Sequence, residues 1–353
     1  KMIKVIGLAL YGAKTASTRQ RLLQYIPDLL TYGIDLKVHY LLDDDYIEKT
    51  FSGGSPSILS IIRSYYCRIQ MLLKARNVDL IILHCELLPF APYWFEKILL
   101  RFPYIYDFDD AFFLKYKRGK YAYMSPILGN KFDSVIRSAR YVTAGSRYLY
   151  EYSNFLNTNV KLLPTVINTE KQQYYNIAIK SEKIFTIGWI GSPSTAKYLE
   201  SIVEPLSIIG KECKIHFNVI GGKAPYIPNI KINEIDWDLN TEIDNLSKFD
   251  VGIMPVPDTE WARGKCAYKL IQYLGSSIPV VASKVGANID VVTSDCGFLV
   301  NNCNEWVSAL RVLRDNPKLR IEYGNAGRER AVEKYSLSVN LPIFASIIKK
   351  IVQ

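Results

Sequence analysis

The chain alternates short apolar runs with segments of helical periodicity, and no other feature constrains its fold as strongly. The runs are rich in Val, Ile and Leu and end in glycine or polar loops, which is typical of buried parallel strands. They lie at residues 3–10, 36–42, 79–84, 104–110, 141–146 and 160–168, and again at 185–190, 215–222, 230–235, 251–256, 278–282 and 297–300. The pattern predicts an α/β protein with two Rossmann-like domains, whose parallel sheets face a central cleft.

The length of 353 residues agrees with two domains. We expect a first domain over 1–168, to which a last helix at 338–353 returns, and a second domain over 169–337 that begins with the polar linker 169–182. No apolar run approaches the ~18–20 residues that cross a bilayer, and no cleavable signal pattern stands at the start. The six cysteines and three histidines show no metal-ligand spacing, so we expect a cytoplasmic protein without a bound metal.

Positive charge is concentrated in the first half of the chain. Of the net charge of +10, residues 1–168 carry +8, from 22 Lys and Arg against 14 Asp and Glu. Such a surplus suits a nucleic acid, an anionic membrane surface or a phosphorylated substrate. The segment 115–123 alternates basic and aromatic residues, and the helix expected at 58–76 mixes apolar, aromatic and basic positions. Because no nucleic-acid-binding motif accompanies them, a membrane surface is the favoured partner, and a mobile loop or a core helix with a basic face is the alternative.

The stretch 250–283 predicts an anion-binding site. It reads as strand, loop, helix and strand, and the loop ends in Arg263, Gly264 and Lys265 just before a helix expected at 266–275. Free amides of a first helical turn and the positive end of the helix dipole attract anions. An ordinary helix start with a solvated lysine would give the same pattern.

Candidate residues of the first domain follow its strands. Gly12, Ser17 and Arg19 come after the first strand, where, with Thr18 and Arg21, they could hold a phosphate or a sugar or form a solvated helix start. His84 ends the third strand, at an edge where open α/β sheets bind ligands. Asp107, Asp109 and Asp110 crowd the tip of the next strand and could orient sugar hydroxyls, bind a metal or cap a helix.

These motifs resemble those of GT-B glycosyltransferases, in particular the retaining glycosyltransferase family four. The resemblance covers nearly the whole chain. The second half carries it most strongly, through Asp250-Val-Gly-Ile-Met-Pro255, Lys265-Cys-Ala-Tyr-Lys-Leu-Ile-Gln-Tyr-Leu274, Pro279-Val-Val-Ala-Ser283 and Gly297-Phe-Leu-Val300. The first half adds Ser17-Thr-Arg-Gln-Arg21, Ala144-Gly-Ser146 and Leu163-Pro-Thr-Val-Ile-Asn168.

The chain departs from the family pattern in the donor site. The family has two glutamates eight positions apart, where this sequence has Gly264 and Gln272, and its Arg and Lys after the first strand of the second domain are Trp189 and Ser194 here. We therefore expect positive charge from Lys265 beside Arg263 and a ribose contact from Gln272. The other donor contacts are expected from the amides of Lys265, Cys266 and Ala267 and from the loop residues Gly191, Ser192, Ser194 and Thr195.

The resemblance implies an enzyme of class EC 2.4. It would transfer a sugar, with retention of configuration, from a UDP-, GDP- or dTDP-linked donor to a lipid-linked glycan in bacterial O-antigen, capsule or exopolysaccharide synthesis. No cofactor or metal would be needed, and the enzyme would work at the inner face of the cell membrane. Asp109, Asp110 and Lys265 are its expected catalytic residues, with Gly12, Ser17, Arg19 and His84 on the acceptor side. A sugar-nucleotide epimerase or hydrolase of the same fold is one alternative, and an inactive basic binding module is another.

Overall fold

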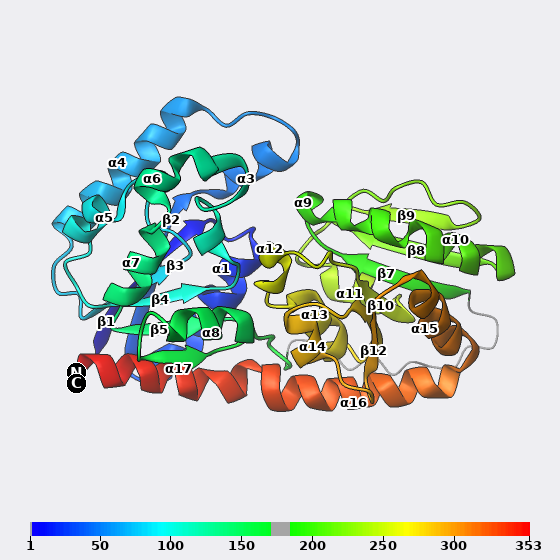
Figure 1. Ribbon diagram of the computed structural model, residues 1–353. Helices are drawn as coiled ribbons and strands as arrows, with labels where there is room; N and C mark the ends of the chain where they lie inside the picture. The colour runs from blue at the N-terminus through cyan, green and yellow to red at the C-terminus, as the bar shows by residue number, and fades with distance from the viewer. Residues whose placement is uncertain (1, 171–183) are drawn as a thin grey trace. The chain divides into compact units, whose positions relative to one another are not determined.

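The computed structural model describes residues 2–170 and 184–353, which form two compact units, each built on a six-stranded parallel sheet (Figure 1). The first unit comprises Lys1–Val166, Gly264–Cys266 and Leu337–Gln353, and the second comprises Ile167–Arg263 and Ala267–Ser336. The prediction of an α/β protein with two Rossmann-like domains is confirmed. Most of the linker expected at 169–182 lies outside the described residues.

The sheet of the first unit has the strand order β2-β1-β3-β4-β5-β6, with every neighbouring pair parallel. Its strands are β1 (Ile3–Tyr11), β2 (Ile34–Leu42), β3 (Leu80–His84), β4 (Tyr104–Phe108), β5 (Tyr141–Ala144) and β6 (Val160–Leu162). The order reverses between β1 and β3, because β1 pairs with β2 on one side and with β3 on the other. In open α/β sheets ligands bind at such a reversal, outside the carboxyl ends of the strands.

The helices of the first unit follow the predicted alternation with one break. They are α1 (Ala16–Arg21), α2 (Ile26–Thr31), α3 (Asp44–Phe51), α4 (Ile58–Lys74), α5 (Tyr93–Leu99), α6 (Ser125–Leu128), α7 (Lys131–Ser138), α8 (Arg147–Asn154) and α17 (Leu337–Val352), with 3-10 turns η1 (Leu23–Tyr25), η2 (Phe112–Leu114) and η3 (Gly119–Met124). The pattern predicts one helix over 20–32, but the backbone leaves the helical region at Leu22, and Pro27 starts a new turn because it has no amide hydrogen.

The second unit repeats the arrangement, with the strand order β12-β11-β10-β7-β8-β9. Its strands are β7 (Phe185–Ile190), β8 (Ile215–Ile220), β9 (Lys231–Ile235), β10 (Val251–Met254), β11 (Val280–Ser283) and β12 (Gly297–Val300). Its helices are α9 (Pro193–Ala196), η4 (Lys197–Ile202), α10 (Val203–Glu212), α11 (Glu242–Leu246), α12 (Glu260–Arg263), α13 (Tyr268–Gly275), α14 (Ala287–Val291), α15 (Cys303–Asp315) and α16 (Pro317–Tyr335). Here the order reverses between β7 and β10.

Each sheet lies in a hydrophobic core. In the first unit, α17 packs against α2 and β3, and its Phe344, Ala345 and Ile348 share one hydrophobic core with residues of β1. In the second unit one core lies on the side of α13 and α16, and another on the side of α10 and α15. Among the described residues, no helix combines the length and apolar character needed to cross a membrane.

Candidate functional site

Three polar side chains of the first unit meet at the carboxyl ends of β1, β3 and β4. The hydroxyl of Ser17, in α1, lies 2.8 Å from Nε2 of His84 and donates a hydrogen bond of 2.5 Å to Oδ2 of Asp109. His84 is the last residue of β3 and is buried, and Asp109 follows β4 and is half-buried. The sequence places each residue separately at a strand end, and the structure joins them in one hydrogen-bonded cluster.

A buried carboxylate orients the ring of His84. Nδ1 of His84 lies 2.8 Å from Oδ2 of Asp107. Both oxygens of this carboxylate accept hydrogen bonds from Arg21, and Oδ1 also accepts one from the Thr143 hydroxyl at 2.6 Å. Burial raises the pKa of Asp107, but the charge of Arg21 and the hydrogen bonds from His84 and Arg21 outweigh it and hold that pKa well below its ordinary range. An ionised Asp107 favours a proton on Nδ1, which leaves Nε2 of His84 as an acceptor. Arg21 is therefore a buried support, not a ligand for a phosphate.

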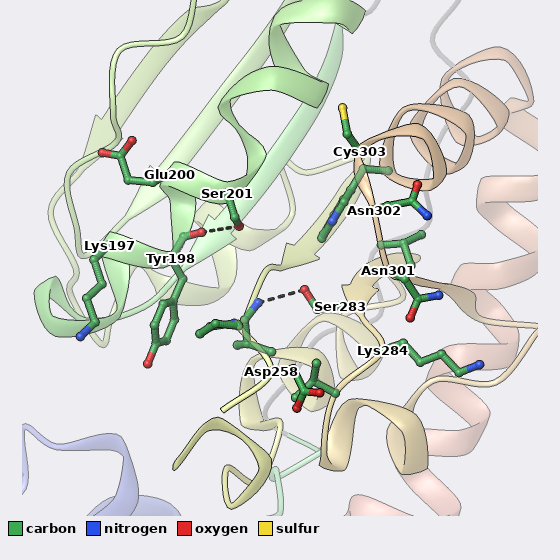
Figure 2. A pocket seen from close by; sticks show the side chains of 15 residues that line it. Lys197, Tyr198, Glu200, Ser201, Asp258, Ser283, Lys284, Asn301, Asn302 and Cys303 are labelled. Carbon is green, nitrogen blue, oxygen red and sulfur yellow. Dashed lines mark hydrogen bonds between the residues drawn. The ribbon is translucent and has the colours of Figure 1, made fainter. Parts of the chain in front are cut away.

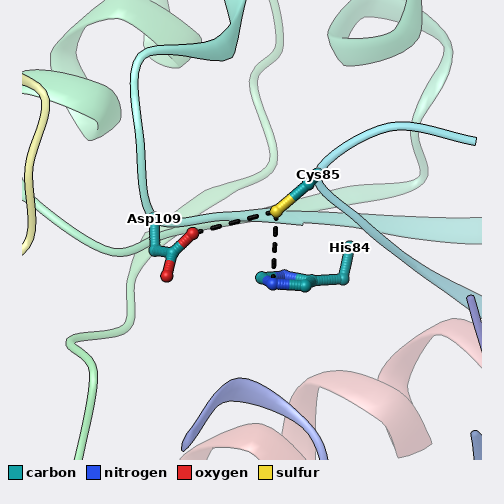
Figure 3. A group of neighbouring side chains, drawn as sticks. All are labelled: His84, Cys85 and Asp109. Atoms are coloured by element: carbon teal, nitrogen blue, oxygen red, sulfur yellow. Dashed lines mark hydrogen bonds between the residues drawn. The ribbon is translucent and has the colours of Figure 1, made fainter. Parts of the chain in front are cut away.

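Cys85 completes a group that could hold a metal ion. Side chains of successive strand residues point to opposite faces of a sheet. Cys85 leaves the strand conformation with a left-handed φ of 67°, and its Sγ lies 3.2 Å from Nε2 of the preceding residue, His84 (Figure 3). Ligand atoms of His84, Cys85 and Asp109 all lie within 4.8 Å of one another. No metal-ligand spacing is visible in the sequence, because His84 and Cys85 stand at the end of β3 whereas Asp109 follows β4. Metal independence stays a prediction.

Lys265 and Cys266 lie in the first unit, at the tip of β4. Nζ of Lys265 donates to Oδ1 of Asp110 at 3.3 Å, and Sγ of Cys266 donates to the carbonyl of Asp109 at 2.9 Å. The sequence pattern groups these two residues with the donor loop of the second domain, whereas the structure groups them with the aspartates. Both residues precede Ala267, which has a left-handed φ of 53° and stands directly before the start of α13 at Tyr268.

Gly12 and Arg19 shape the loop between β1 and α1. A Cβ at Gly12 would lie 2.3 Å from Oδ1 of Asp44, which caps this loop by accepting from the amide of Lys14. The guanidinium of Arg19 donates to the carbonyls of Ala13 and Lys14, at 2.9 and 2.7 Å. Arg19 thus holds the loop that presents Ser17, and its acceptor-side role stays a prediction.

In the second unit a different lysine reaches the loop after β7. Nζ of Lys269 lies 3.1 Å from Oγ1 of Thr195 and 4.4 Å from the centre of the Trp189 ring, which fixes it by a cation–π contact. The Trp189 side chain is buried and packs on Gly191, where a Cβ would lie 2.4 Å from the ring. Lys269 is not among the donor residues expected from the sequence, and it lies in the first turn of α13.

The hydroxyls of the loop after β7, and the side chain of Arg263, contact residues close to them in the sequence. Oγ of Ser192 lies 2.9 Å from Oγ of Ser194, and Oγ1 of Thr195 donates to the Ser192 carbonyl at 3.1 Å. Arg263 donates to both oxygens of Asp258, at 2.6 and 3.0 Å, on the exposed side of α12. These three hydroxyls therefore form a polar rim at the carboxyl end of β7, with Lys269 beside it.

A carboxylate that the sequence analysis missed lies beside Gln272. Nε2 of the buried Gln272 donates to Oε1 of Glu242 at 2.9 Å, and Nε1 of Trp237 donates to the other oxygen at 2.5 Å. Glu242 begins α11, and Trp237 follows β9. The site thus has a carboxylate next to the position where the family pattern expects one, but it comes from another element.

A cavity of about 580 Å³ lies elsewhere in the second unit, at the carboxyl ends of β10, β11 and β12 (Figure 2). Its polar lining includes Lys197, Asp258, Ser283, Lys284 and Asn301. None of the donor-site residues expected from the sequence is among those that line it, although Lys197 and Tyr198 in its lining follow the loop after β7 directly.

No protein-family model and no curated protein matches the sequence. Solved structures match it over its whole length. A glycosyltransferase from Rickettsia africae ESF-5 matches with a TM-score of 0.72 and 13% identity, over 100% of this chain and 99% of that one. Alr3699/HepE from Anabaena, solved with UDP and glucose, matches with a TM-score of 0.71 and 12% identity, over 99% and 100% of the two chains.

These similarities identify the fold as GT-B, as predicted. At such low identity they establish the fold alone. A Listeria monocytogenes protein described as a UDP-N-acetylglucosamine 2-epimerase shares it, with a TM-score of 0.63 and 12% identity over 99% and 96% of the chains. The fold therefore accommodates more than one reaction on sugar nucleotides, and the site must decide between them.

Proposed function

We propose that this protein is a glycosyltransferase that moves a sugar from a nucleoside-diphosphate sugar to a hydroxyl of a glycan. The observation that carries the proposal is the position of Lys269, held on Trp189 beside Thr195 at the carboxyl end of β7. A fixed cation beside a hydroxyl-rich loop and the start of α13 suits a diphosphate. It would stabilise the negative charge that develops on the diphosphate as the sugar leaves.

The donor site follows from this cation. Gly191, Ser192, Ser194 and Thr195 would donate to the phosphate oxygens, together with the amide of Ala267. Glu242 is suited to accept hydrogen bonds from a ribose diol, with Gln272 holding its carboxylate in place at 2.9 Å. The base of the donor is uracil, guanine or thymine, and the UDP seen in the Anabaena structure makes uracil the first to test.

The cluster of the first unit would hold the acceptor. Nε2 of His84 and the carboxylate of Asp109 can accept from a sugar hydroxyl that takes the place of the Ser17 hydroxyl. Asp110 and Lys265 form an ion pair next to this cluster. Lys265, Arg263 and Cys266 are also candidates to contact the departing diphosphate. With retention of configuration, as the family resemblance implies, the donor phosphate assists loss of the acceptor proton, so that no metal and no separate protein base is required.

The acceptor we propose is a lipid-linked glycan of a bacterial O-antigen, capsule or exopolysaccharide. The support is the resemblance to family four and the surplus of +8 over residues 1–168. A lipid-linked acceptor would bring the enzyme to the inner face of the cell membrane, where the basic first unit would meet anionic lipid.

A two-stage experiment tests the proposal. Thermal unfolding is measured with UDP, GDP and dTDP, since a ligand at 100 times its Kd adds about 2.7 kcal/mol of stability. Sugar nucleotides of the stabilising base are then incubated with and without glycan acceptors, and the anomeric configuration of the product is read by NMR. Turnover that needs an acceptor is the expected result. Epimerisation or hydrolysis of the donor alone would replace the proposal, and no stabilisation by any of the three would contradict it.

A further inference from the structure

Large apolar side chains are exposed together on four elements of the first unit, α4, α5, η3 and α6. Ile58 and Leu59 of α4 are 74% and 78% exposed, and Tyr123 and Ile127, of η3 and α6, are 76% and 72% exposed. Single exposed hydrophobic residues are normal, but a group of them marks an interaction site. We call this group the α4–α6 surface; its apolar members are Ile58, Leu59, Ile62, Tyr66, Leu73, Trp94, Ile98, Tyr123 and Ile127.

The exposed side chains of α4 form one stripe. Ile58, Ile62 and Tyr66 are four residues apart, which places them on the same side of a helix with 3.6 residues per turn. Arg68 and Leu72 lie beside this stripe and are buried, and Arg68 donates to the carbonyls of Ala9 and His39 in β1 and β2. The helix is therefore fixed on the sheet with its apolar stripe facing outward.

Contacts join α4 to the other three elements. α4 packs against α5, and the hydroxyl of Tyr65 in α4 donates to the carbonyl of Pro89 at 3.0 Å (Figure 1). The ring of the next residue, Phe90, lies edge-on to that of Tyr121 in η3, with centroids 5.1 Å apart. α6 follows η3 directly and packs on it. The apolar side chains thus belong to one region of the first unit.

The charge of this surface is entirely positive. Arg63 and Lys74 of α4, Lys97 of α5 and Lys120 of η3 are exposed beside the apolar residues. The four elements, all of them described, contain a single acidic residue, Glu96, and it is fully buried. Elements that expose basic side chains and no carboxylate of their own are complementary to an anionic partner.

We propose that the α4–α6 surface docks on an anionic lipid bilayer. Apolar side chains enter the headgroup boundary, Trp94, Tyr66 and Tyr123 lie at the interface with their polar atoms in water, and the lysines and arginines meet lipid phosphates. Among these residues, the sequence had indicated only α4 and Lys120 with its aromatic neighbours. The docking rests on the membrane contact proposed above and names the surface that makes it. It does not require sugar transfer, so a failure to bind vesicles would remove the membrane contact and leave the proposed transfer to its own test.

The test is sedimentation of the whole chain with lipid vesicles. One set consists of phosphatidylcholine alone and the other of an equal mixture with phosphatidylglycerol. We expect binding to the mixed vesicles, weakened by salt and at least tenfold lower on phosphatidylcholine. The variant I62S/W94S should lose binding at least tenfold, and R63Q/K97Q should lose it on mixed vesicles only. F155S is the control, because Phe155 is 89% exposed at the end of α8, outside the surface.

Two readouts separate docking from loss of fold. Each variant should keep the wild-type circular dichroism and thermal midpoint, since the changed side chains are exposed. A blue shift of tryptophan fluorescence on adding mixed vesicles should disappear in W94F. Absence of wild-type binding to mixed vesicles, or equal binding by I62S/W94S and F155S, would overturn the proposal. In that case an acidic protein becomes the better partner for this surface.

Discussion

The ammonium of Lys269 lies 3.1 Å from the hydroxyl of Thr195, and the ring of Trp189 holds it there from 4.4 Å. This arrangement depends on the absence of a side chain at Gly191. A Cβ at that position would lie 2.4 Å from the Trp189 ring and 2.7 Å from Nζ of Lys269. The glycine therefore lets a tryptophan and a lysine form the cation site where the family pattern has an arginine and a lysine.

Gly191→Ala should damage both packing and binding. Overpacking of a buried ring costs about 1–3 kcal/mol, which urea unfolding would measure. Displacement of Lys269 should also raise the Kd of the preferred nucleoside diphosphate about tenfold. Unchanged stability together with unchanged nucleotide affinity would show that Trp189 and Lys269 do not hold each other as described.

His84→Ala should separate acceptor chemistry from donor binding. His84 lies in the acceptor cluster, so we expect transfer to fall about 10²-fold or more while the Kd of the nucleoside diphosphate stays unchanged. His216→Ala, in β8 of the second unit, is the matched control and should leave transfer near the wild-type rate. Equal transfer by the two variants would remove His84 from the reaction.

Asp107→Asn should destabilise the first unit by about 3–5 kcal/mol, because it leaves the buried charge of Arg21 uncompensated. The pKa of Asp107 is lowered in the folded state, so its contribution is present above the unfolded pKa of about 3.9 and is lost as the pH falls toward the folded value. Urea unfolding between pH 3 and 7 would measure it. Asp45→Asn, which removes only an exposed pair with Lys49, should change stability by less than about 1 kcal/mol.

Glu96 should give stability the opposite dependence on pH. Burial raises its pKa to about 7, although Lys131 lies 2.9 Å away and opposes the shift. Because the folded state holds this proton more tightly, its stabilising effect is full below the unfolded pKa of about 4.3 and is lost as the pH rises toward 7. Glu96→Gln should flatten that part of the profile in thermal unfolding. An unchanged slope would mean that Glu96 is already ionised at low pH.

The fold and the strand ends could be predicted because their signals are local. Runs such as 79–84 and 215–222 are apolar enough to be strands, and polar residues after a parallel strand must lie at the ligand-binding edge. Ser17, His84 and Asp109 were found in this way. The contacts between them could not be predicted, since no sequence pattern gives the distances between residues 17, 84 and 109.

The sequence does not show which partner each lysine side chain contacts. The segment 115–123 reads as a basic surface, yet Lys115 is paired with the buried Glu86 and Lys117 with Asp133. Likewise the helical periodicity from 266 favours Lys265 as the donor cation, but the left-handed Ala267 moves the helix start and brings Lys269 to the loop. Periodicity does not fix a helix start to within the two residues that separate the expected 266 from the observed 268.

The most direct test of the donor site compares Lys269→Ala with Lys211→Ala, an exposed lysine of α10, by calorimetric titration. Each variant is titrated with the preferred nucleoside diphosphate and with the nucleoside alone. A hydrogen bond to a charged group contributes about 1.5–3 kcal/mol, so Lys269→Ala should weaken diphosphate binding roughly 10- to 150-fold and leave nucleoside binding unchanged. Lys211→Ala should match the wild type in both titrations. Wild-type affinity of Lys269→Ala for the diphosphate would contradict the account of this site.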